Sequence, residues 1–336
     1  MTYNLETTYS YGTITDQSLP KFVMMWGIPG SGKSTYIEKH FGDDYTVVSS
    51  DIMREELYGD VNDMDHNSEV FDAMRVRTIN TLHRGKNVVY DATNLVYKRR
   101  VALLNEIKKI KCTKIIHCMV VPFSICLSRN SQRERTVPYM SMYKMRSQTS
   151  IPYFYEGWNV IELHITPITS DHIALYPKDV GYMHRSYNQV NANHSYTLGQ
   201  HCDYVGNHVK QVIAKKEQSI SPFPHKNSII EAAYMHDIGK AHTQTFKSGD
   251  PNAHYYGHEY CGAYESLFYE RDRDSMDLLS DILYRAVLIQ WHMIPYHWES
   301  PQCENPDKLI TKYKNILGHV LFDEIMMIHE ADKSCH

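Results

Sequence analysis

The stretch GIPGSGKST, residues 27–35, constrains the fold of this chain more than any other. It lies between an apolar run, 21–27, and a helical pattern, which is the strand–loop–helix context of the phosphate-binding motif G-x-x-x-x-G-K-[ST]. Glycines let such a loop turn its amides toward phosphates, so we expect Lys33 to reach the β- and γ-phosphates of ATP and Ser34 to ligate Mg²⁺. A glycine-rich turn that merely caps a helix is the alternative, and the order of the flanking elements argues against it. The candidate nucleotide-binding residues are Gly27, Gly30, Ser31, Gly32, Lys33, Ser34 and Thr35.

Short apolar runs alternate with amphipathic stretches through the first half of the chain. Alternation of this kind predicts an α/β domain with a doubly wound, mostly parallel sheet covered by helices. The runs expected to be strands are 21–27, 45–51, 87–91, 114–121 and 159–165, and the stretches expected to be helices include 68–84 and 98–111.

The second half of the chain has a different character. Beyond about residue 195 no convincing strand is found, and fifteen of the twenty histidines follow residue 170. We therefore expect an α/β domain over 1–170, a linker over 171–192 and an all-α domain over 193–336. The expected helices of the second domain are 198–217, 227–241, 257–271, 275–293 and 307–333.

Composition excludes several classes of protein. The formal net charge of −4 argues against broad, non-specific coating of nucleic acid. No apolar run approaches the ~20 residues that a membrane span requires, and the first residues lack the basic start and apolar core of a secretory signal. The seven cysteines form no CxxC pair. We expect a cytoplasmic protein with reduced thiols and no membrane association.

Asp51 and Arg54 lie where the second apolar run ends, and open parallel sheets hold their ligands at the carboxyl ends of strands. From one helical turn, the carboxylate could take a proton from an acceptor hydroxyl while the arginine grips a neighbouring phosphate. The alternative for Asp51 is the N-cap of the helix that begins there, and one residue can be both. We interpret Asp51 as a candidate general base.

Further candidates follow the third apolar run. Asp91 could orient Mg²⁺ or the acceptor, or it could hold its own turn with Asn94. Arg129 and Arg133, four residues apart, are expected to face one way from one helix, from which they could swing over the triphosphate and neutralise developing charge. Arg135 fits a solvated charge run better.

The sequence YMHDIGKAH, residues 234–242, places His236 beside Asp237 and Lys240 one helical turn further on. On a helix the doublet diverges by about 100°, so both residues could ligate only a metal near the helix edge. Lys240 would border whatever the metal binds. Other donors recur at helical positions, and the candidate metal ligands are His201, His236, Asp237, His258, His292 and Asp332.

A lone histidine in a helical domain is usually a packed or surface residue. We adopt that interpretation for His208, His225, His319, His329 and His336. Six ligand-type residues on separate helical patterns beside a lysine favour a metal site instead. Imidazoles with carboxylates suit one or two ions of Mn, Fe, Co, Ni or Zn better than Mg²⁺ alone.

The ordered set GxxGSGKS…SSDxxR…DATN…RNxxR…VP, over about residues 20–165, resembles the kinase module of polynucleotide 5′-hydroxyl kinases. The resemblance implies that Lys33 and Ser34 bind ATP and Mg²⁺, that Asp51 is the general base on the 5′-hydroxyl, and that Arg54 holds the adjacent phosphate of the acceptor. Arg129 and Arg133 would be lid residues. The wider family also includes small-molecule kinases with the same loops.

The set His201…His236-Asp237…His258…His292…Asp332, over about residues 190–336, resembles the HD-domain phosphohydrolases. That resemblance implies that the first histidine, the doublet and the last aspartate hold one metal. The two intervening histidines would serve a second metal or the phosphate. Two such metals would bridge a hydroxide and hold the scissile phosphate.

The main hypothesis is a bifunctional end-healing enzyme that phosphorylates 5′-OH ends and removes 3′-phosphate or 2′,3′-cyclic phosphate. Its partners would be RNA or DNA ends with 5′-OH and 3′-phosphate and a ligase acting downstream, and a homo-oligomer is compatible with the sequence. One alternative is a nucleoside or small-metabolite kinase fused to a nucleotide phosphohydrolase. Another is an ATP-dependent switch whose helical domain binds nucleic acid without hydrolysing it.

Overall fold

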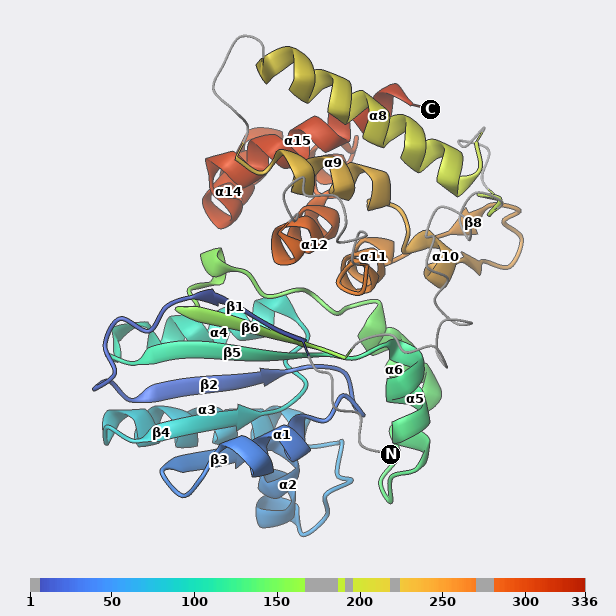
Figure 1. The fold of residues 1–336 in the computed structure, drawn as a ribbon. Coiled ribbons are helices and arrows are strands. Elements are labelled where there is room, and N and C mark those ends of the chain that lie inside the picture. The colour runs from blue at the N-terminus through green and yellow to red at the C-terminus, as the bar shows by residue number, and fades with distance from the viewer. Residues whose placement is uncertain (1–6, 167–186, 191–195, 218–223, 270–280, 336) are drawn as a thin grey trace. The chain divides into compact units, whose positions relative to one another are not determined.

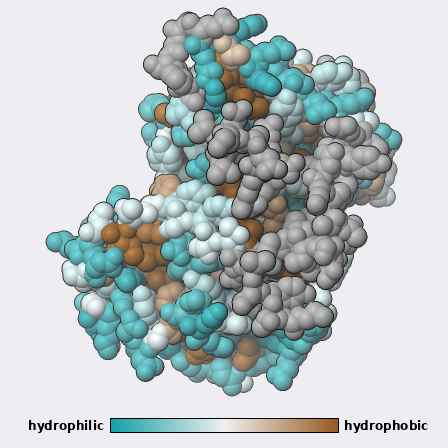
Figure 2. All heavy atoms as spheres, in the orientation of Figure 1, coloured by the Kyte–Doolittle hydropathy of each residue, from teal (hydrophilic) through white to brown (hydrophobic). Residues whose placement is uncertain are grey.

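The computed structural model describes residues 7–166, 187–190, 196–217, 224–269 and 281–335. Contacts divide the chain into two compact units. Unit 1 comprises Met1–Met145 and Pro152–Pro167, and unit 2 comprises Arg146–Ile151 and Ile168–His336. Most of the predicted linker, 171–192, lies outside the described residues. Hydrophilic residues predominate on the face in Figure 2, with apolar atoms in separate patches. Among the helices described, none has the length and apolar character needed to cross a membrane.

Unit 1 is built on a six-stranded sheet in the order β1-β6-β5-β2-β4-β3 (Figure 1). β2 to β6 run parallel to one another, whereas β1 pairs antiparallel with β6. The prediction of a mostly parallel sheet followed by a helical region is confirmed. The strands are β1 Thr7–Gly12, β2 Lys21–Trp26, β3 Tyr45–Ser49, β4 Asn87–Asp91, β5 Thr113–Val120 and β6 Val160–Ile165.

The central strand β2 is buried because helices cover the sheet. Val23 and Met25 point to one face, where they share a core with Ile37 of the first helix. Phe22 lies on the other face and stacks on Trp158, with ring centroids 6.3 Å apart. The helices of unit 1 are α1 Lys33–His40, α2 Ser50–Tyr58, α3 Asn67–His83, α4 Tyr97–Glu106, α5 Phe123–Ser131 and α6 Tyr139–Arg146, with 3₁₀ turns at Ile107–Lys109 and Phe154–Glu156.

A buried ion pair ties the β4–α4 connection to the segment before β6. Arg100 contacts Glu156 with an Nη2–Oε1 distance of 2.6 Å, and both side chains are fully buried. The same guanidinium donates to the carbonyl oxygens of Asn94 and Leu95, each at 3.0 Å. Trp158 Nε1 also donates to Glu156 at 2.9 Å. Every charged group in this cluster therefore has partners, as a buried pair requires.

Unit 2 is helical, with one short hairpin. The prediction of no strand beyond residue 195 is wrong, because Thr245–Phe246 (β7) and Ala253–His254 (β8) pair antiparallel. A turn at Asp250 closes this hairpin, its carboxylate accepting from the Asn252 amide at 2.9 Å. The helices are α8 Leu198–Glu217, α9 Lys226–Met235, α10 Lys240–Thr243, α11 His258–Ser266, α12 Ile282–Trp291, α13 Pro295–Glu299, α14 Pro306–Leu317 and α15 His319–Ser334.

Two predicted helices of unit 2 are interrupted. The stretch 307–333 contains two helices because Gly318, with φ of +74°, ends α14 and precedes α15. The stretch 227–241 is broken after Met235, so the His-Asp doublet lies in the turn between α9 and α10. The predicted helical residues 270–280 lie outside the described part of the chain.

Candidate functional site

The loop between β2 and α1 has the geometry of a phosphate-binding loop. A Cβ on Gly30, whose φ is +84°, would lie 2.5 Å from the Cys126 carbonyl oxygen, so only glycine fits there. Gly32, with φ of +91°, is the N-cap of α1. A Cβ added to Gly32 would have no heavy atom within 4 Å. The N-terminus of α1 and its free amides therefore face open space, where an anion is stabilised.

Lys33 folds back over this loop. Its Nζ donates to the carbonyl oxygens of Gly27, at 2.9 Å, and Ile28, at 3.3 Å. Burial lowers the pKa of Lys33, while the charge of Asp91 opposes that shift. Burial also raises the pKa of Asp91, which ends β4, and Lys33 opposes it. The Lys33 ammonium and the Asp91 carboxylate thus lie close enough to influence each other, and both line one cavity.

A cavity of 1380 Å³ in unit 1 brings the predicted kinase residues together. Gly27 is absent from its lining, and its amide instead donates to the Thr93 carbonyl at 3.1 Å, which anchors the base of the loop. The cavity is large enough for a nucleotide and part of an acceptor. Its lining includes Gly30, Ser31, Gly32, Lys33, Ser34, Thr35, Asp51, Arg54, Asp91, Arg129, Arg133 and Arg135.

Asp51 lies in the first turn of α2, but it is not the N-cap. Ser49 is the N-cap, and its hydroxyl accepts from the Asp51 amide at 3.3 Å. The Asp51 carboxylate is therefore available to the cavity, and its side chain is 45% exposed. The alternative interpretation of Asp51 as a cap is wrong.

Arg54 supports Asp51. Its Nη1 lies 3.0 Å from Asp51 Oδ1, and its Nη2 donates to Asn67 Oδ1 at 2.7 Å. Arg54 is only 5% exposed, and Nη1 also donates to the Ser50 carbonyl at 3.2 Å. These partners occupy both terminal nitrogens, so the expected grip of Arg54 on an acceptor phosphate does not match its contacts in this structure.

Three arginines approach the cavity from the segment after β5. Arg129 lies in the last turn of α5, but α5 ends at Ser131, so the prediction that Arg129 and Arg133 share one helix is wrong. Arg135, which the sequence placed in a solvated charge run, instead contacts Asp51 Oδ1 with its Nη1 at 2.6 Å. All three line the same cavity and make its rim cationic.

The alternative role of Asp91 as a partner of Asn94 is not observed. Asn94, with φ of +50°, donates from its side chain to the Met25 and Ala92 carbonyl oxygens, at 2.6 and 3.2 Å. That amide fixes the turn after β4 and leaves the Asp91 carboxylate to the cavity.

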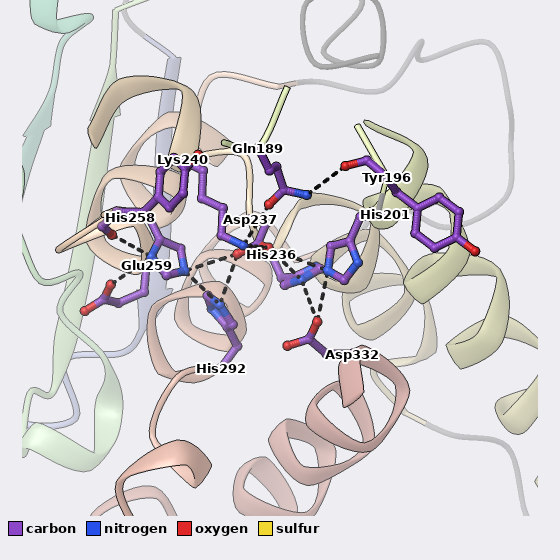
Figure 3. A network of polar contacts seen from close by, with 12 residues as sticks. Gln189, Tyr196, His201, His236, Asp237, Lys240, His258, Glu259, His292 and Asp332 are labelled. Carbon is purple, nitrogen blue, oxygen red and sulfur yellow. Dashed lines mark hydrogen bonds and ion pairs between the residues drawn. The ribbon is translucent and has the colours of Figure 1, made fainter. Parts of the chain in front are cut away.

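The six predicted metal ligands converge in unit 2 (Figure 3). Each is at most 6% exposed, although they come from different helices and turns. They form two sets whose ligand atoms lie within 4.8 Å of one another. The sets are His201, His236 and Asp332, and Asp237, His258 and His292.

Asp237 joins the two sets. Its Oδ1 lies 3.1 Å from His258 Nε2 and 3.7 Å from His292 Nε2. Its Oδ2 lies 3.4 Å from His236 Nε2 and 3.6 Å from His201 Nε2. One carboxylate therefore faces both ligand sets.

The other carboxylate completes the first set. Asp332 Oδ1 lies 2.9 Å from His201 Nε2 and 3.6 Å from His236 Nε2. Asp332 comes from α15 and His201 from α8, so the set ties the two ends of unit 2 together.

Backbone carbonyls orient His236, His258 and His292. His236 Nδ1 lies 2.9 Å from the Ala233 oxygen, and His258 and His292 repeat this contact with carbonyl oxygens three residues earlier, at 2.8 and 2.6 Å. A carbonyl can only accept, so each Nδ1 carries a proton and each Nε2 faces the cluster. His236 Nε2 is buried and makes no hydrogen bond among the described residues. This donor set fits divalent transition metals.

Charges in this cluster are strongly coupled. Burial favours the neutral form of His236, but Asp237 and Asp332 outweigh it and raise its pKa well above the usual value. Burial opposes ionisation of Asp237, but Lys240 and His236 hold its pKa well below the usual value. His292 differs, because burial lowers its pKa.

Lys240 borders the site as expected, although it begins a new helix, α10. Its Nζ lies 2.6 Å from Asp237 Oδ2 and donates to Gln189 Oε1 at 3.0 Å. Sequence reasoning missed Tyr296, whose hydroxyl donates to Asp332 Oδ2 at 2.7 Å. Tyr296 belongs to α13, a few residues after the candidate ligand His292.

A family model described as an AAA domain matches residues 22–149. Among solved structures, a Pnkp1/Rnl/Hen1 RNA repair complex contains a chain 22% identical, with a TM-score of 0.36, covering 40% of this chain and 45% of that chain. A second structure of the Pnkp1/Rnl/Hen1 complex gives 21% identity and a TM-score of 0.32, covering 38% and 44%. A protein from Chloroflexus aurantiacus proposed to be a kinase gives 17% identity and a TM-score of 0.34, covering 41% and 80%.

The matches leave most of unit 2 outside the family model, which ends at residue 149. The chain also spans less than half the length of the first two solved chains. Among curated proteins, none matches this chain. Residues 22–149 are thus similar to AAA domains, and the P-loop within them implies ATP and Mg²⁺ as ligands.

Proposed function

We propose that this chain is a bifunctional end-healing enzyme of the polynucleotide kinase–HD phosphohydrolase kind. One unit phosphorylates 5′-OH ends with ATP, and the other removes 3′-phosphate or 2′,3′-cyclic phosphate. The observation that carries the proposal is the pairing of a P-loop cavity containing a supported carboxylate, Asp51, with a buried six-ligand cluster around Asp237. The first arrangement suits phosphoryl transfer, and the second suits metal-assisted hydrolysis.

In the kinase reaction, the acceptor hydroxyl oxygen bonds to the γ-phosphorus and the bond to the β–γ bridging oxygen breaks, which releases ADP. Asp51 takes the hydroxyl proton, while Arg54 and Arg135 hold its carboxylate in place. Lys33, Arg129 and Arg133 neutralise the charge that spreads over the phosphoryl oxygens. Mg²⁺, held through Ser34, would supply further charge neutralisation.

In the hydrolase reaction, Asp237 would serve both ligand sets, and the histidines would offer their Nε2 atoms as metal ligands. Bound metals would supply a more acidic water and polarise the phosphate. Lys240 holds Asp237 Oδ2 and lies at the edge of the cluster, where it could also contact a phosphate oxygen. Tyr296 fixes the orientation of Asp332.

One observation favours the second candidate, a nucleoside or small-metabolite kinase fused to a nucleotide phosphohydrolase. The terminal nitrogens of Arg54 contact Asp51, Ser50 and Asn67 in this structure. Arg54 is therefore not positioned to bind a phosphate of the acceptor. A cavity whose acceptor side lacks that contact suits a nucleoside as well as a polynucleotide end.

The test uses one oligonucleotide that carries both a 5′-OH and a 3′-phosphate, with ATP, Mg²⁺ and added Mn²⁺. We expect the wild-type protein to change both ends, Lys33→Met to lose only 5′ phosphorylation, and Asp237→Ala to lose only 3′ dephosphorylation. His208→Ala, which changes a histidine outside the cluster, is the matched control and should keep both activities. Retention of 3′ dephosphorylation in Asp237→Ala would refute the assignment of that activity to this cluster. A wild-type protein that binds the oligonucleotide but leaves its 3′-phosphate in place would favour the nucleic-acid-binding switch.

A further inference from the structure

A second group of metal-ligating side chains lies in unit 1, outside the kinase cavity. His117 on β5 and Glu162 on β6 are register partners, and His164 follows two residues later on the same face of β6. Their ligand atoms lie within 4.8 Å of one another. None of the three lines the cavity around the P-loop. The group therefore needs an explanation of its own.

The distances within this group match a metal site. His117 Nδ1 lies 2.9 Å from His164 Nε2 and 3.1 Å from Glu162 Oε2, and His164 Nε2 lies 3.5 Å from the same oxygen. A tetrahedral ion with bonds of roughly 2.0–2.1 Å separates its ligand atoms by about 3.3 Å. The three observed separations lie around that value.

Hydrogen bonds alone cannot satisfy all three contacts. The Glu162 carboxylate only accepts, and each imidazole nitrogen of a neutral ring either donates or accepts. If His117 Nδ1 and His164 Nε2 both carry a proton, two donors face each other. If only one of these nitrogens carries a proton, the other is an acceptor that faces the Glu162 carboxylate, which is also an acceptor. Every choice of neutral tautomers leaves one contact between like groups, whereas a cation at the centre is attracted by all three atoms.

The surroundings prepare the two histidines for this role. His164 Nδ1 lies 3.2 Å from Thr8 Oγ1, which orients the ring from its far side. The His117 and His164 side chains are 10% and 4% exposed, while Glu162 is 27% exposed and leaves one side open to water.

The group also touches the helix that follows the phosphate-binding loop. The ring centroid of Tyr36 lies 5.3 Å from His117 and 4.7 Å from His164. Phe41, just after α1, lies 5.7 Å from His117. An ion held here would fasten β5 to β6 and brace α1, which begins at Lys33.

We propose that His117, Glu162 and His164 form a third divalent-metal site, separate from the six-ligand cluster, that takes a zinc-class ion with water as its fourth ligand. Its role is structural: the ion stabilises unit 1 and holds α1 against the sheet. The two nitrogens and one oxygen favour Zn²⁺ or Co²⁺ over Mg²⁺.

The experiment uses the full chain carrying His236→Ala and His292→Ala, which removes one ligand from each set of the cluster in unit 2. After incubation with Zn²⁺ and gel filtration over a weak chelator, we expect one bound equivalent by elemental analysis. Co²⁺ in its place should give the intense visible absorption of a four-coordinate site. Absence of both signals in this background would overturn the proposal and leave a hydrogen-bonded triad.

Adding Glu162→Gln to that background should lower zinc affinity at least tenfold and abolish the rise in Tm that zinc causes. Glu38→Gln, which changes an exposed carboxylate on α1, is the matched control and should retain both effects. Circular dichroism verifies folding, and His117→Gln serves as a second variant. Unchanged zinc binding in both folded ligand variants would overturn the assignment of these residues.

Discussion

Arg135 contacts Asp51 across 2.6 Å, although 84 residues separate them in the sequence. Arg54 approaches the same oxygen at 3.0 Å, so two guanidinium groups fix one carboxylate at the mouth of the cavity. Two such charge-assisted contacts restrict the orientation of Asp51 more than either one alone.

Arg135→Ala should therefore impair catalysis without impairing nucleotide binding. We expect kcat for phosphorylation to fall by about 10²-fold because the base is misplaced, while the KM for ATP changes little. Steady-state kinetics measure both values. Arg77→Ala, which removes an exposed ion pair with Glu56, is the control and should leave kcat unchanged. An equal loss in both variants would contradict a positioning role.

Breaking the Arg100–Glu156 pair should destabilise unit 1 strongly. Glu156→Ala leaves the Arg100 guanidinium buried without its carboxylate, which costs roughly 3–5 kcal/mol of unfolding free energy. Glu56→Ala breaks an exposed pair with Arg77, and its cost should stay under about 1 kcal/mol. Urea unfolding gives both values. Similar losses of unfolding free energy in Glu156→Ala and Glu56→Ala would show that burial does not determine how much an ion pair stabilises this protein.

Tyr296→Phe should weaken metal binding in unit 2. The variant keeps the ring and removes the hydroxyl that orients Asp332, so we expect metal affinity to fall roughly 10- to 100-fold. Titration of the chelator-treated protein with Mn²⁺ or Co²⁺ measures this. Tyr313→Phe, which changes a nearby tyrosine outside the ligand sets, should bind as the wild type does. Equal affinities for all three proteins would remove Tyr296 from the site.

His242 should make the stability of unit 2 depend on pH. Burial lowers its pKa below the usual value of 6.5. Above about pH 6.5 the ring is neutral in both states, whereas below it the unfolded chain takes up a proton that the folded protein resists, so stability is lost as pH falls. His242→Gln should reduce the difference in Tm between pH 7.5 and 5.5 in metal-free protein. His208→Gln, the control, should leave the difference in Tm unchanged. An unchanged difference in His242→Gln would contradict the assignment of this pH dependence to His242.

The sequence predicted the parallel part of the sheet because each of its strands is an apolar run followed by a turn. It did not predict β1, Thr7–Gly12, whose side chains alternate between half-buried and exposed. That strand is paired through its backbone with β6, which lies about 150 residues later in the chain, and local pattern carries no signal for such a partner. The break at Gly318 was readable, since glycine after a helical stretch is a common stop.

The site residues divide in the same way. Lys33, Asp51 and the six candidate ligands of unit 2 could be proposed from the sequence because their residue types and local spacing are typical of such sites, and the structure brings each set together. Arg135 and Tyr296 were missed because their roles depend on partners 84 and 36 residues away. The role expected for Arg54 changed for a related reason: Asn67, from α3, occupies a nitrogen that the sequence left for phosphate.

The most direct test of the central claim is a competition for labelled phosphate. The protein receives γ-labelled ATP, Mg²⁺, and equal concentrations of a 5′-OH oligonucleotide with a 3′-phosphate and a free nucleoside. We predict that label enters the 5′ end of the oligonucleotide and that Asp51→Ala lowers this rate by roughly 10²–10⁴-fold. Label in the nucleoside alone would contradict the claim that this protein acts on polynucleotide ends.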